Sequence, residues 1–79
     1  MKTIQQLSQE LGIGVDTLRV WERRYGFPAP QRDRRGHRSY AQNEVEELKI
    51  VKNLQDLGQR PGRIIALSPN QRRNLLREL

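Results

Sequence analysis

The residues best suited to binding chemistry in this 79-residue chain are arginines gathered in one short stretch. Between residues 14 and 40 lie seven arginines against three acidic residues, so this segment carries a net charge of +4 out of the chain's +6. An arginine guanidinium is a flat, forked array of donors that matches phosphate oxygens and the edge of guanine. The expected partner is therefore a polyanion, namely nucleic acid, an anionic membrane surface or an acidic protein. A charged surface that serves only solubility is the alternative interpretation.

The sequence lacks the parts needed for catalysis or metal binding. His37 is the only histidine, cysteine is absent, and no group of carboxylates has a spacing suited to a metal ion. No Ser, His and Asp set is plausible for nucleophilic catalysis, and no glycine-rich phosphate loop follows a strand. We therefore expect no enzyme activity and no cofactor in this chain. His37 is expected to bond to backbone or to a phosphate, or to serve simply as a turn residue.

Length and composition predict one small domain covering residues 1–79, with a core that is marginal at this size. The absence of cysteine fits a reducing compartment. No apolar run approaches the roughly 20 residues that span a bilayer, and no signal-peptide pattern follows Met1. The sequence therefore favours a soluble domain with a cytoplasmic location and no membrane partner.

Residues 3–25 predict two helices separated by a tight turn. Thr3 and Gln6 have the spacing of a capping box, and apolar residues then recur at helical intervals until Gly12. A second helix is expected to start at Val15, after a three-residue turn that contains two glycines. Two helices joined in this way are typical of a helix-turn-helix, although other helical hairpins share the pattern.

The second helix divides into an apolar face and a polar face. At about 100° per residue, the buried face is expected to hold Val15, Leu18, Trp21 and Tyr25. The other side presents Asp16, Thr17, Arg19, Val20, Arg23 and Arg24. Val20 is the apolar residue at the centre of this polar face, and it is either a tolerated exposed valine or a contact for a thymine methyl. Glu22 lies towards the core side and is expected to be a local partner for an arginine.

Residues 27–40 predict a two-stranded wing. Pro28 and Pro30 favour extended backbone before them, and Gly36 allows the positive φ that a hairpin turn needs. Phe27 and Tyr40 are expected to anchor the base of the wing to the core. The residues expected to face a partner are Arg34, Arg35, His37 and Arg38. The alternative interpretation of this stretch is a disordered basic loop.

Residues 42–79 are expected to form helices that support the first two. A long helix is predicted over residues 43–57 from the apolar residues Val45, Leu48, Val51, Leu54 and Leu57. A short helix should begin at Pro61 and bury Ile64, Ile65 and Leu67, and a last helix should begin after Ser68. The remaining leucines, Leu75, Leu76 and Leu79, have little core left to enter in this prediction. They indicate contact with a second subunit or a further domain.

Duplex DNA is the polyanion that these elements fit best. A helix can read base edges in the major groove, while wing arginines track phosphates or enter a narrow minor groove. RNA is disfavoured because its deep, narrow major groove excludes a helix. Exposed aromatic residues that could stack on bases are also missing, since all four aromatic residues are assigned to the core or to the base of the wing.

Three stretches make the sequence recognisable: TLRVWERRYGFP at 17–28, GHRSY at 36–40 and GQRPGRIIALS at 58–68. They resemble the MerR family of bacterial transcription regulators, and in particular its CarA/CarH/LitR-like branch, in which this domain precedes a cobalamin-binding region. The resemblance implies a mainly α fold, a winged helix-turn-helix with a small two-stranded β wing. The helix-turn-helix would span about 3–25, the wing about 27–40 and the supporting helices about 42–79.

The same resemblance implies a partner and assigns roles to residues. Family members bind inverted-repeat operators in double-stranded DNA as homodimers, whereas this chain alone would be a monomer. The recognition helix would present Thr17, Arg19, Val20, Arg23 and Arg24. Tyr25 would reach a phosphate, His37 and Arg38 would face DNA, and Tyr40 would be mostly structural. A cobalamin domain, or another effector domain, would lie downstream of this chain.

Two departures from the family pattern affect helix starts. Gly14 and Ala41 stand where serines are usual, which should weaken the following helices by about 1 kcal/mol or less. Two other functions remain open at this point. One is an architectural DNA-binding protein like the excisionases, and the other is a basic module that docks an acidic protein partner.

Overall fold

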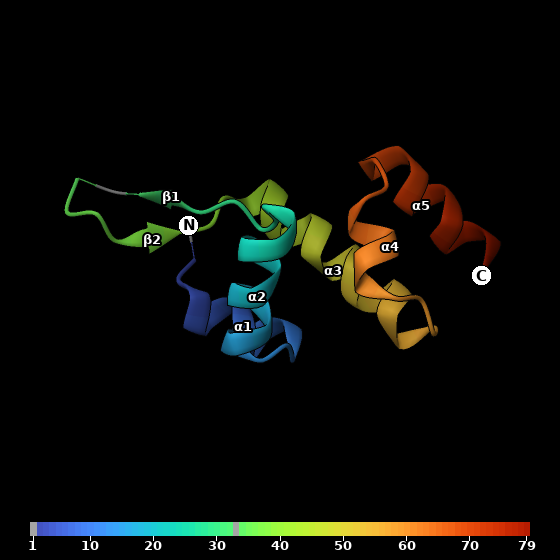
Figure 1. The fold of residues 1–79 in the computed structure, drawn as a ribbon, viewed down its shortest axis with the longest axis horizontal. Coiled ribbons are helices and arrows are strands. Elements are labelled where there is room, and N and C mark those ends of the chain that lie inside the picture. Colours follow the sequence, from blue (N-terminus) through green and yellow to red (C-terminus); the bar gives the residue numbers. More distant parts are fainter. Residues whose placement is uncertain (1, 33) are drawn as a thin grey trace.

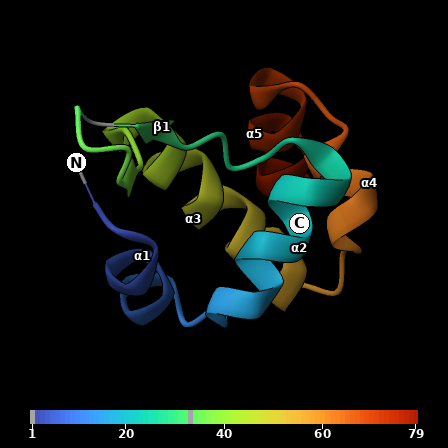
Figure 2. The same ribbon diagram turned by 60° about the vertical axis from the view of Figure 1, so that its left-hand side comes forward.

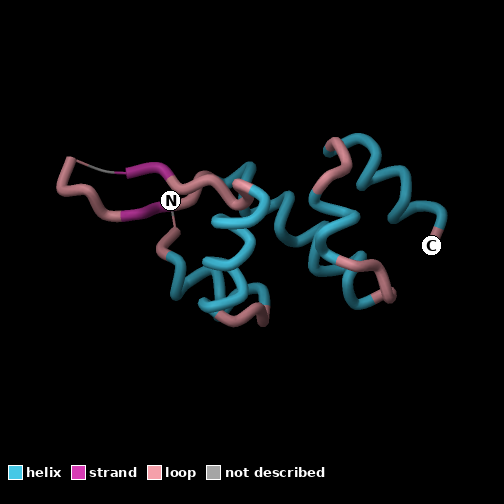
Figure 3. Tube along the Cα trace, viewed as in Figure 1, coloured by secondary structure: helices cyan, strands magenta, loops and turns pink. Residues whose placement is uncertain are grey.

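The computed structural model describes residues 2–32 and 34–79, so Met1 and the Asp33 position of the predicted wing lie outside the described residues. The molecule is elongated, 42 × 21 × 21 Å, with the wing at one end and the last helix at the other (Figure 1). Its elements in chain order are α1 (Ile4–Leu11), α2 (Val15–Tyr25), β1 (Gln31–Arg32), β2 (Arg38–Ser39), α3 (Gln42–Asp56), α4 (Pro61–Ile65) and α5 (Pro69–Glu78). Helices dominate the trace, and among the described residues the strands occur only in the wing, which confirms the predicted fold class (Figure 3).

Helices α1 and α2 form the predicted helix-turn-helix. The Gln6 amide donates to Thr3 Oγ1 at 3.2 Å and the Thr3 amide donates to Gln6 Oε1 at 2.9 Å, which completes the capping box. Gly12 ends α1 in the left-handed region, at φ 70°. Gly14 precedes α2 without a side-chain cap, as its missing hydroxyl predicts. The two helices then pack through buried apolar residues, so the turn fixes the direction of α2.

Helix α3 lies at the centre of the molecule. It contacts α1 on one side and α4 and α5 on the other, an arrangement that Figures 1 and 2 both show. Its fully buried residues are Val45, Leu48, Val51 and Leu54. Leu57 was predicted to continue this stripe, and that prediction is wrong because its side chain is 53% exposed. The helix ends at Asp56, so helical periodicity no longer places Leu57 against the core.

The strands form a short antiparallel hairpin that pairs Gln31 with Ser39 and Arg32 with Arg38. Gly36 lies in the connection at φ 78°, the conformation expected of a turn glycine. The guanidinium of Arg32 donates to the Gly36 carbonyl at 2.9 Å, which braces the tip from within. The hairpin is therefore formed by the described residues, as the wing prediction required.

Helices α4 and α5 close the far end of α3. Ser68 and Gln71 form a second capping box, which starts α5 as predicted. Leu75 and Leu76 are half-buried and pack against the core, so the prediction that little core remained for them is wrong. Their burial depends on how α5 packs against α3, which the linear pattern does not show. Leu79 is 56% exposed.

Arg72 is the buried charged residue of this region, with 5% of its surface exposed. Its guanidinium donates to the carbonyls of Ile64 and Ile65 at 2.9 and 3.1 Å, the last carbonyls of α4. It also lies 5.1 Å from the Phe27 ring centroid and 3.7 Å from Glu47 Oε2. One side chain thus joins α3, α4, α5 and the segment before the wing. Nothing in the sequence pattern predicts the burial of this arginine.

Candidate nucleic-acid interface

The polar side of α2 is exposed because the opposite side of the helix is buried in the core. Leu18 and Trp21 are buried, and this fixes the rotation of the helix. The residues that the same rotation leaves exposed are Asp16, Thr17, Arg19, Arg23 and Arg24. Arg23 and Arg24 occupy the last turn, where cations are favoured by the helix dipole. The prediction of an exposed basic face on α2 is confirmed.

Val20 and Tyr25 do not lie where the helical wheel placed them. Val20 is half-buried and packs against the core, rather than standing at the centre of an exposed face. Tyr25 is 39% exposed, so its assignment to the buried face is wrong. A wheel gives only the angle of a residue about its own helix. It contains no information about which neighbouring elements reach that side of the helix or where they stop.

Tyr25 lies against the start of α4 instead of entering the core. A Cβ atom placed on Gly62 would lie 3.0 Å from the Tyr25 hydroxyl, so the ring and the α4 backbone are in close approach. The absence of a side chain at Gly62 makes room for the tyrosine. The last turn of α2 is therefore supported by α4, with the Tyr25 side chain partly open to solvent.

The wing residues predicted to face a partner are exposed, namely Arg34, Arg35, His37 and Arg38. They extend the exposed arginines of α2 along the molecule. Tyr40 at the base of the wing is fully buried, as expected of a residue that anchors the wing to the core. Its backbone forms an antiparallel bridge with Lys2, through a Tyr40 amide donating to the Lys2 carbonyl at 2.9 Å and the reciprocal bond at 3.2 Å.

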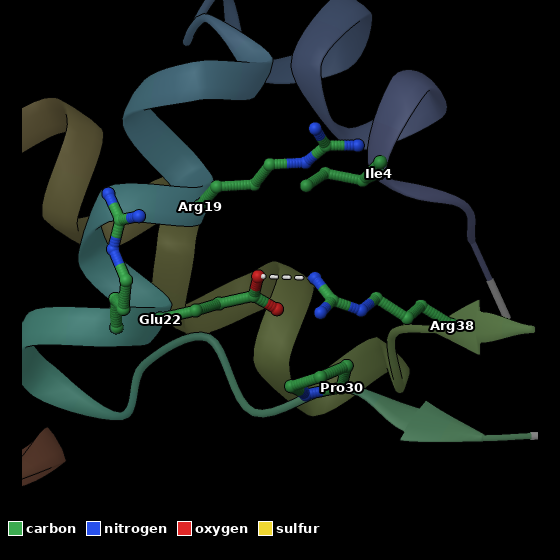
Figure 4. Close-up of a pocket in the computed structure, with 6 residues that line it drawn as sticks. Ile4, Arg19, Glu22, Pro30 and Arg38 are labelled. Atoms are coloured by element: carbon green, nitrogen blue, oxygen red, sulfur yellow. Dashed lines mark hydrogen bonds and ion pairs between the residues drawn. The ribbon is translucent and has the colours of Figure 1, made fainter.

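A carboxylate joins the wing to α2. Glu22 Oε1 accepts from the Tyr40 hydroxyl at 2.7 Å, and Oε2 accepts from Arg38 Nη1 at 3.2 Å (Figure 4). Burial raises the pKa of the Tyr40 hydroxyl well above its usual range, and the bonded Glu22 raises it further. The phenol therefore stays protonated and acts as a donor. Glu22 is the local partner for an arginine that the sequence predicted, and the arginine is Arg38.

The junction borders an open hollow between α1, α2 and the wing. Its lining residues are Ile4, Arg19, Glu22, Arg23, Pro30 and Arg38. In Figure 4 the Arg19 side chain extends across this hollow towards Ile4, while Glu22 and Arg38 point towards each other. The hollow has Arg19 and Arg23 on the helix side and Arg38 on the wing side, against the carboxylate of Glu22, so its net positive charge suits an anionic group.

The described residues offer little for other chemistry. Among residues 2–32 and 34–79, no group of three or more His, Asp or Glu side chains is arranged to hold a metal ion. Within the same ranges, no helix is both long and apolar enough to cross a membrane.

Comparison with known proteins places the sequence among regulatory proteins. A family model described as MerR HTH family regulatory protein matches residues 2–71. The mercuric resistance operon regulatory protein of Bacillus cereus is 36% identical over 55 residues, 70% of this chain and 42% of that protein. The HTH-type transcriptional repressor CarH of Myxococcus xanthus is 45% identical over 47 residues, 60% of this chain and 16% of that protein.

A third relative extends the match further along the chain. The HTH-type transcriptional regulator MlrA of Escherichia coli is 32% identical over 69 residues, which cover 87% of this chain and 28% of that protein. The chain therefore spans less than half the length of each of these relatives.

Proposed function

Since this chain belongs to the MerR family of helix-turn-helix regulatory proteins, we propose that it binds double-stranded DNA sequence-specifically, as the DNA-binding part of a bacterial transcriptional regulator. The observation that carries the proposal is one basic surface, in which the exposed Arg19 and Arg23 of α2 line the same hollow as the exposed Arg38 of the wing. Its relatives bear the names of transcriptional regulators, which supports a regulatory rather than an enzymatic role.

In this proposal α2 lies in the major groove and the wing lies over the flanking backbone and minor groove. The α2 residues assigned to DNA are Asp16, Thr17, Arg19, Val20, Arg23, Arg24 and Tyr25. The wing residues assigned to DNA are Arg34, Arg35, His37 and Arg38, with Tyr40 holding the wing in place. Val20 is half-buried, whereas the other α2 residues assigned to DNA are exposed. Its methyl contact with thymine would therefore involve only part of the side chain.

We further infer that two copies act as a homodimer on an inverted repeat, because operator symmetry mirrors the two-fold symmetry of a dimeric regulator. Binding to DNA places the protein in the cytoplasm, with the nucleoid. No cofactor is assigned to this chain.

Alanine substitutions on the two parts of the surface test the proposal. Arg19→Ala and Arg23→Ala are expected to relax base preference, because a bidentate base contact contributes about 1–3 kcal/mol of discrimination. Arg35→Ala and Arg38→Ala are expected to weaken binding to all sequences and to flatten the salt dependence by about one unit. Titrations of labelled duplexes at several salt concentrations measure both effects.

Arg77→Ala is the matched control, because Arg77 is an exposed arginine at the end of α5, remote from the wing (Figure 1). It is expected to leave base preference unchanged. If the four arginines of α2 and the wing behave alike, the division between base reading and backbone contact is wrong. If all of them behave like Arg77, this surface does not bind DNA.

A further inference from the structure

Glu22 is a carboxylate set within the basic surface. Its side chain is 11% exposed, and each of its oxygens bonds a different residue of the wing. Arg38 belongs to β2, and Tyr40 follows that strand at the base of the wing. A single α2 side chain is thus bonded to the wing at two points.

The wing has little internal structure to hold its own orientation. Each strand has two residues, and a two-stranded hairpin is at best marginally stable without further packing. Arg32 and Arg38 lie directly opposite each other, and like charges in that position destabilise a strand pair. Their guanidiniums separate, since Arg32 bonds the Gly36 carbonyl whereas Arg38 bonds Glu22. Glu22 therefore offsets a repulsion that would otherwise loosen the hairpin.

The negative charge of Glu22 lowers the affinity of this surface for DNA phosphates. Phosphate affinity depends on the summed positive charge of the surface, and a carboxylate beside Arg19, Arg23 and Arg38 reduces that sum. The one guanidinium nitrogen that bonds Glu22 leaves other donors of Arg38 available, and the side chain is 44% exposed. The arrangement thus holds Arg38 in one orientation with donors still free to bond.

We propose that Glu22 is a positioning residue that fixes the wing relative to α2, so that it raises sequence discrimination at the expense of non-specific DNA affinity. This inference rests on the proposed function. When Arg38 and the α2 arginines are held in one register, a mismatched sequence cannot be accommodated by movement of the wing. When the wing is loose, phosphate contacts form on any sequence.

Glu22→Gln is the direct test, in which affinities for a selected duplex and for unrelated duplexes are measured with the 79-residue chain. Glutamine preserves the shape but replaces one carboxylate oxygen with an NH2 group, so Tyr40 and Arg38 no longer each donate to an oxygen of their own, and the negative charge that pairs with Arg38 is lost. We expect tighter non-specific binding and a ratio of specific to non-specific affinity that falls by about five-fold or more, the size of one lost base contact. A merely structural role would weaken binding to both kinds of duplex together.

Two other carboxylates provide matched controls. Asp56→Asn makes the same change in net charge at the end of α3, and Glu47→Gln removes a carboxylate that is 14% exposed and paired with arginines of α5. Both are expected to keep the wild-type affinity ratio. In a background that already carries Arg38→Ala, Glu22→Gln is expected to have a smaller effect on the ratio. An undiminished effect would overturn the role through Arg38.

A second readout does not require DNA. Hydrogen exchange of the paired Lys2 and Tyr40 amides is expected to accelerate in Glu22→Gln, while the central amides of α3 keep their rates. Tyr40→Phe removes only the hydroxyl, and it is the variant to test if Glu22→Gln does not fold. Because it breaks one of the two bonds that Glu22 makes to the wing, it is also expected to lower the ratio of specific to non-specific affinity, by less than Glu22→Gln.

The outcomes separate the two proposals. If the unmodified chain prefers no sequence, the proposed function and this inference both fail. If the unmodified chain discriminates between sequences and Glu22→Gln and Tyr40→Phe discriminate as well as it does, only the positioning role of Glu22 is overturned.

Discussion

Arg72 is buried where α3, α4 and α5 meet, and replacing it should destabilise the fold more than replacing any other charged residue. Arg72→Ala removes the donors to the carbonyls of Ile64 and Ile65 and the cation that faces Glu47. Hydrogen bonds to a charged group contribute about 1.5–3 kcal/mol each, and removing one partner of a buried ion pair costs about 3–5 kcal/mol. These values describe the same contacts and are not added together. We expect the free energy of unfolding to fall by about 3 kcal/mol.

That loss is large for a chain of this size. At about 0.05–0.15 kcal/mol per residue, 79 residues are stabilised by roughly 4–12 kcal/mol in total. A loss of about 3 kcal/mol should lower Tm by roughly 10–25 °C. Urea titration followed by circular dichroism gives the free energy, and a thermal scan gives Tm.

Arg73→Ala is the matched control, because Arg73 pairs with the same Glu47 at 3.1 Å but has a side chain that is 47% exposed. An exposed ion pair contributes about 0–1 kcal/mol, so this variant should be close to wild type. Arg72→Lys keeps the charge but cannot reproduce the forked donor geometry, and it should recover less than half of the loss. If Arg72→Ala and Arg73→Ala differ by less than about 1 kcal/mol, the buried guanidinium does not hold α4 and α5 in place.

Three further predictions concern the helix starts, the α2–α4 contact and pH. Ala41→Ser adds a capping hydroxyl before α3, where the backbone is already extended, and should raise the free energy of unfolding by about 0.5–1 kcal/mol in urea titrations; no gain would mean that the hydroxyl does not reach the α3 amides. Gly62→Ala should displace the exposed Tyr25 side chain and weaken DNA binding, whereas its stability should change by less than about 1 kcal/mol because alanine improves helix propensity; unchanged binding would remove Tyr25 from the interface. Burial raises the pKa of Glu44 above its ordinary value of 4.5, so its contribution to stability is complete below that pH and is lost as pH rises through the raised value. Glu44→Gln should therefore be more stable than wild type at pH 7, with a difference that disappears below pH 4.5 in urea titrations at both pH values; a difference that persists in acid would contradict this origin.

The features predicted correctly from sequence are those set by near neighbours in the chain. Both capping boxes, at Thr3 and at Ser68, depend on residues three positions apart. Gly12 and Gly36 adopt the positive φ that the sequence predicts at a helix end and a hairpin turn. Apolar periodicity likewise defines where a helix begins and ends to within about one residue, as the predicted span 43–57 and the observed Gln42–Asp56 show.

The features missed are those set by packing between distant segments. The burial of Arg72 depends on the carbonyls at the end of α4 and on the Phe27 ring, which is far away in sequence. Tyr25 lies outside the core because the absence of a side chain at Gly62 leaves room for the tyrosine against α4. The partner of Glu22 was predicted only as an arginine, since its identity depends on how the base of the wing lies against α2.

Selection from a random duplex DNA pool with the purified chain is the sharpest test of sequence-specific binding. Sequencing of the retained duplexes is expected to show enrichment of one short half-site, because α2 presents arginines that read base edges while the wing contacts the backbone. Retention without enrichment would indicate binding through phosphates alone, as in an architectural protein. If no duplex is retained even at low salt, where phosphate contacts are strongest, the assignment of this surface to DNA is wrong.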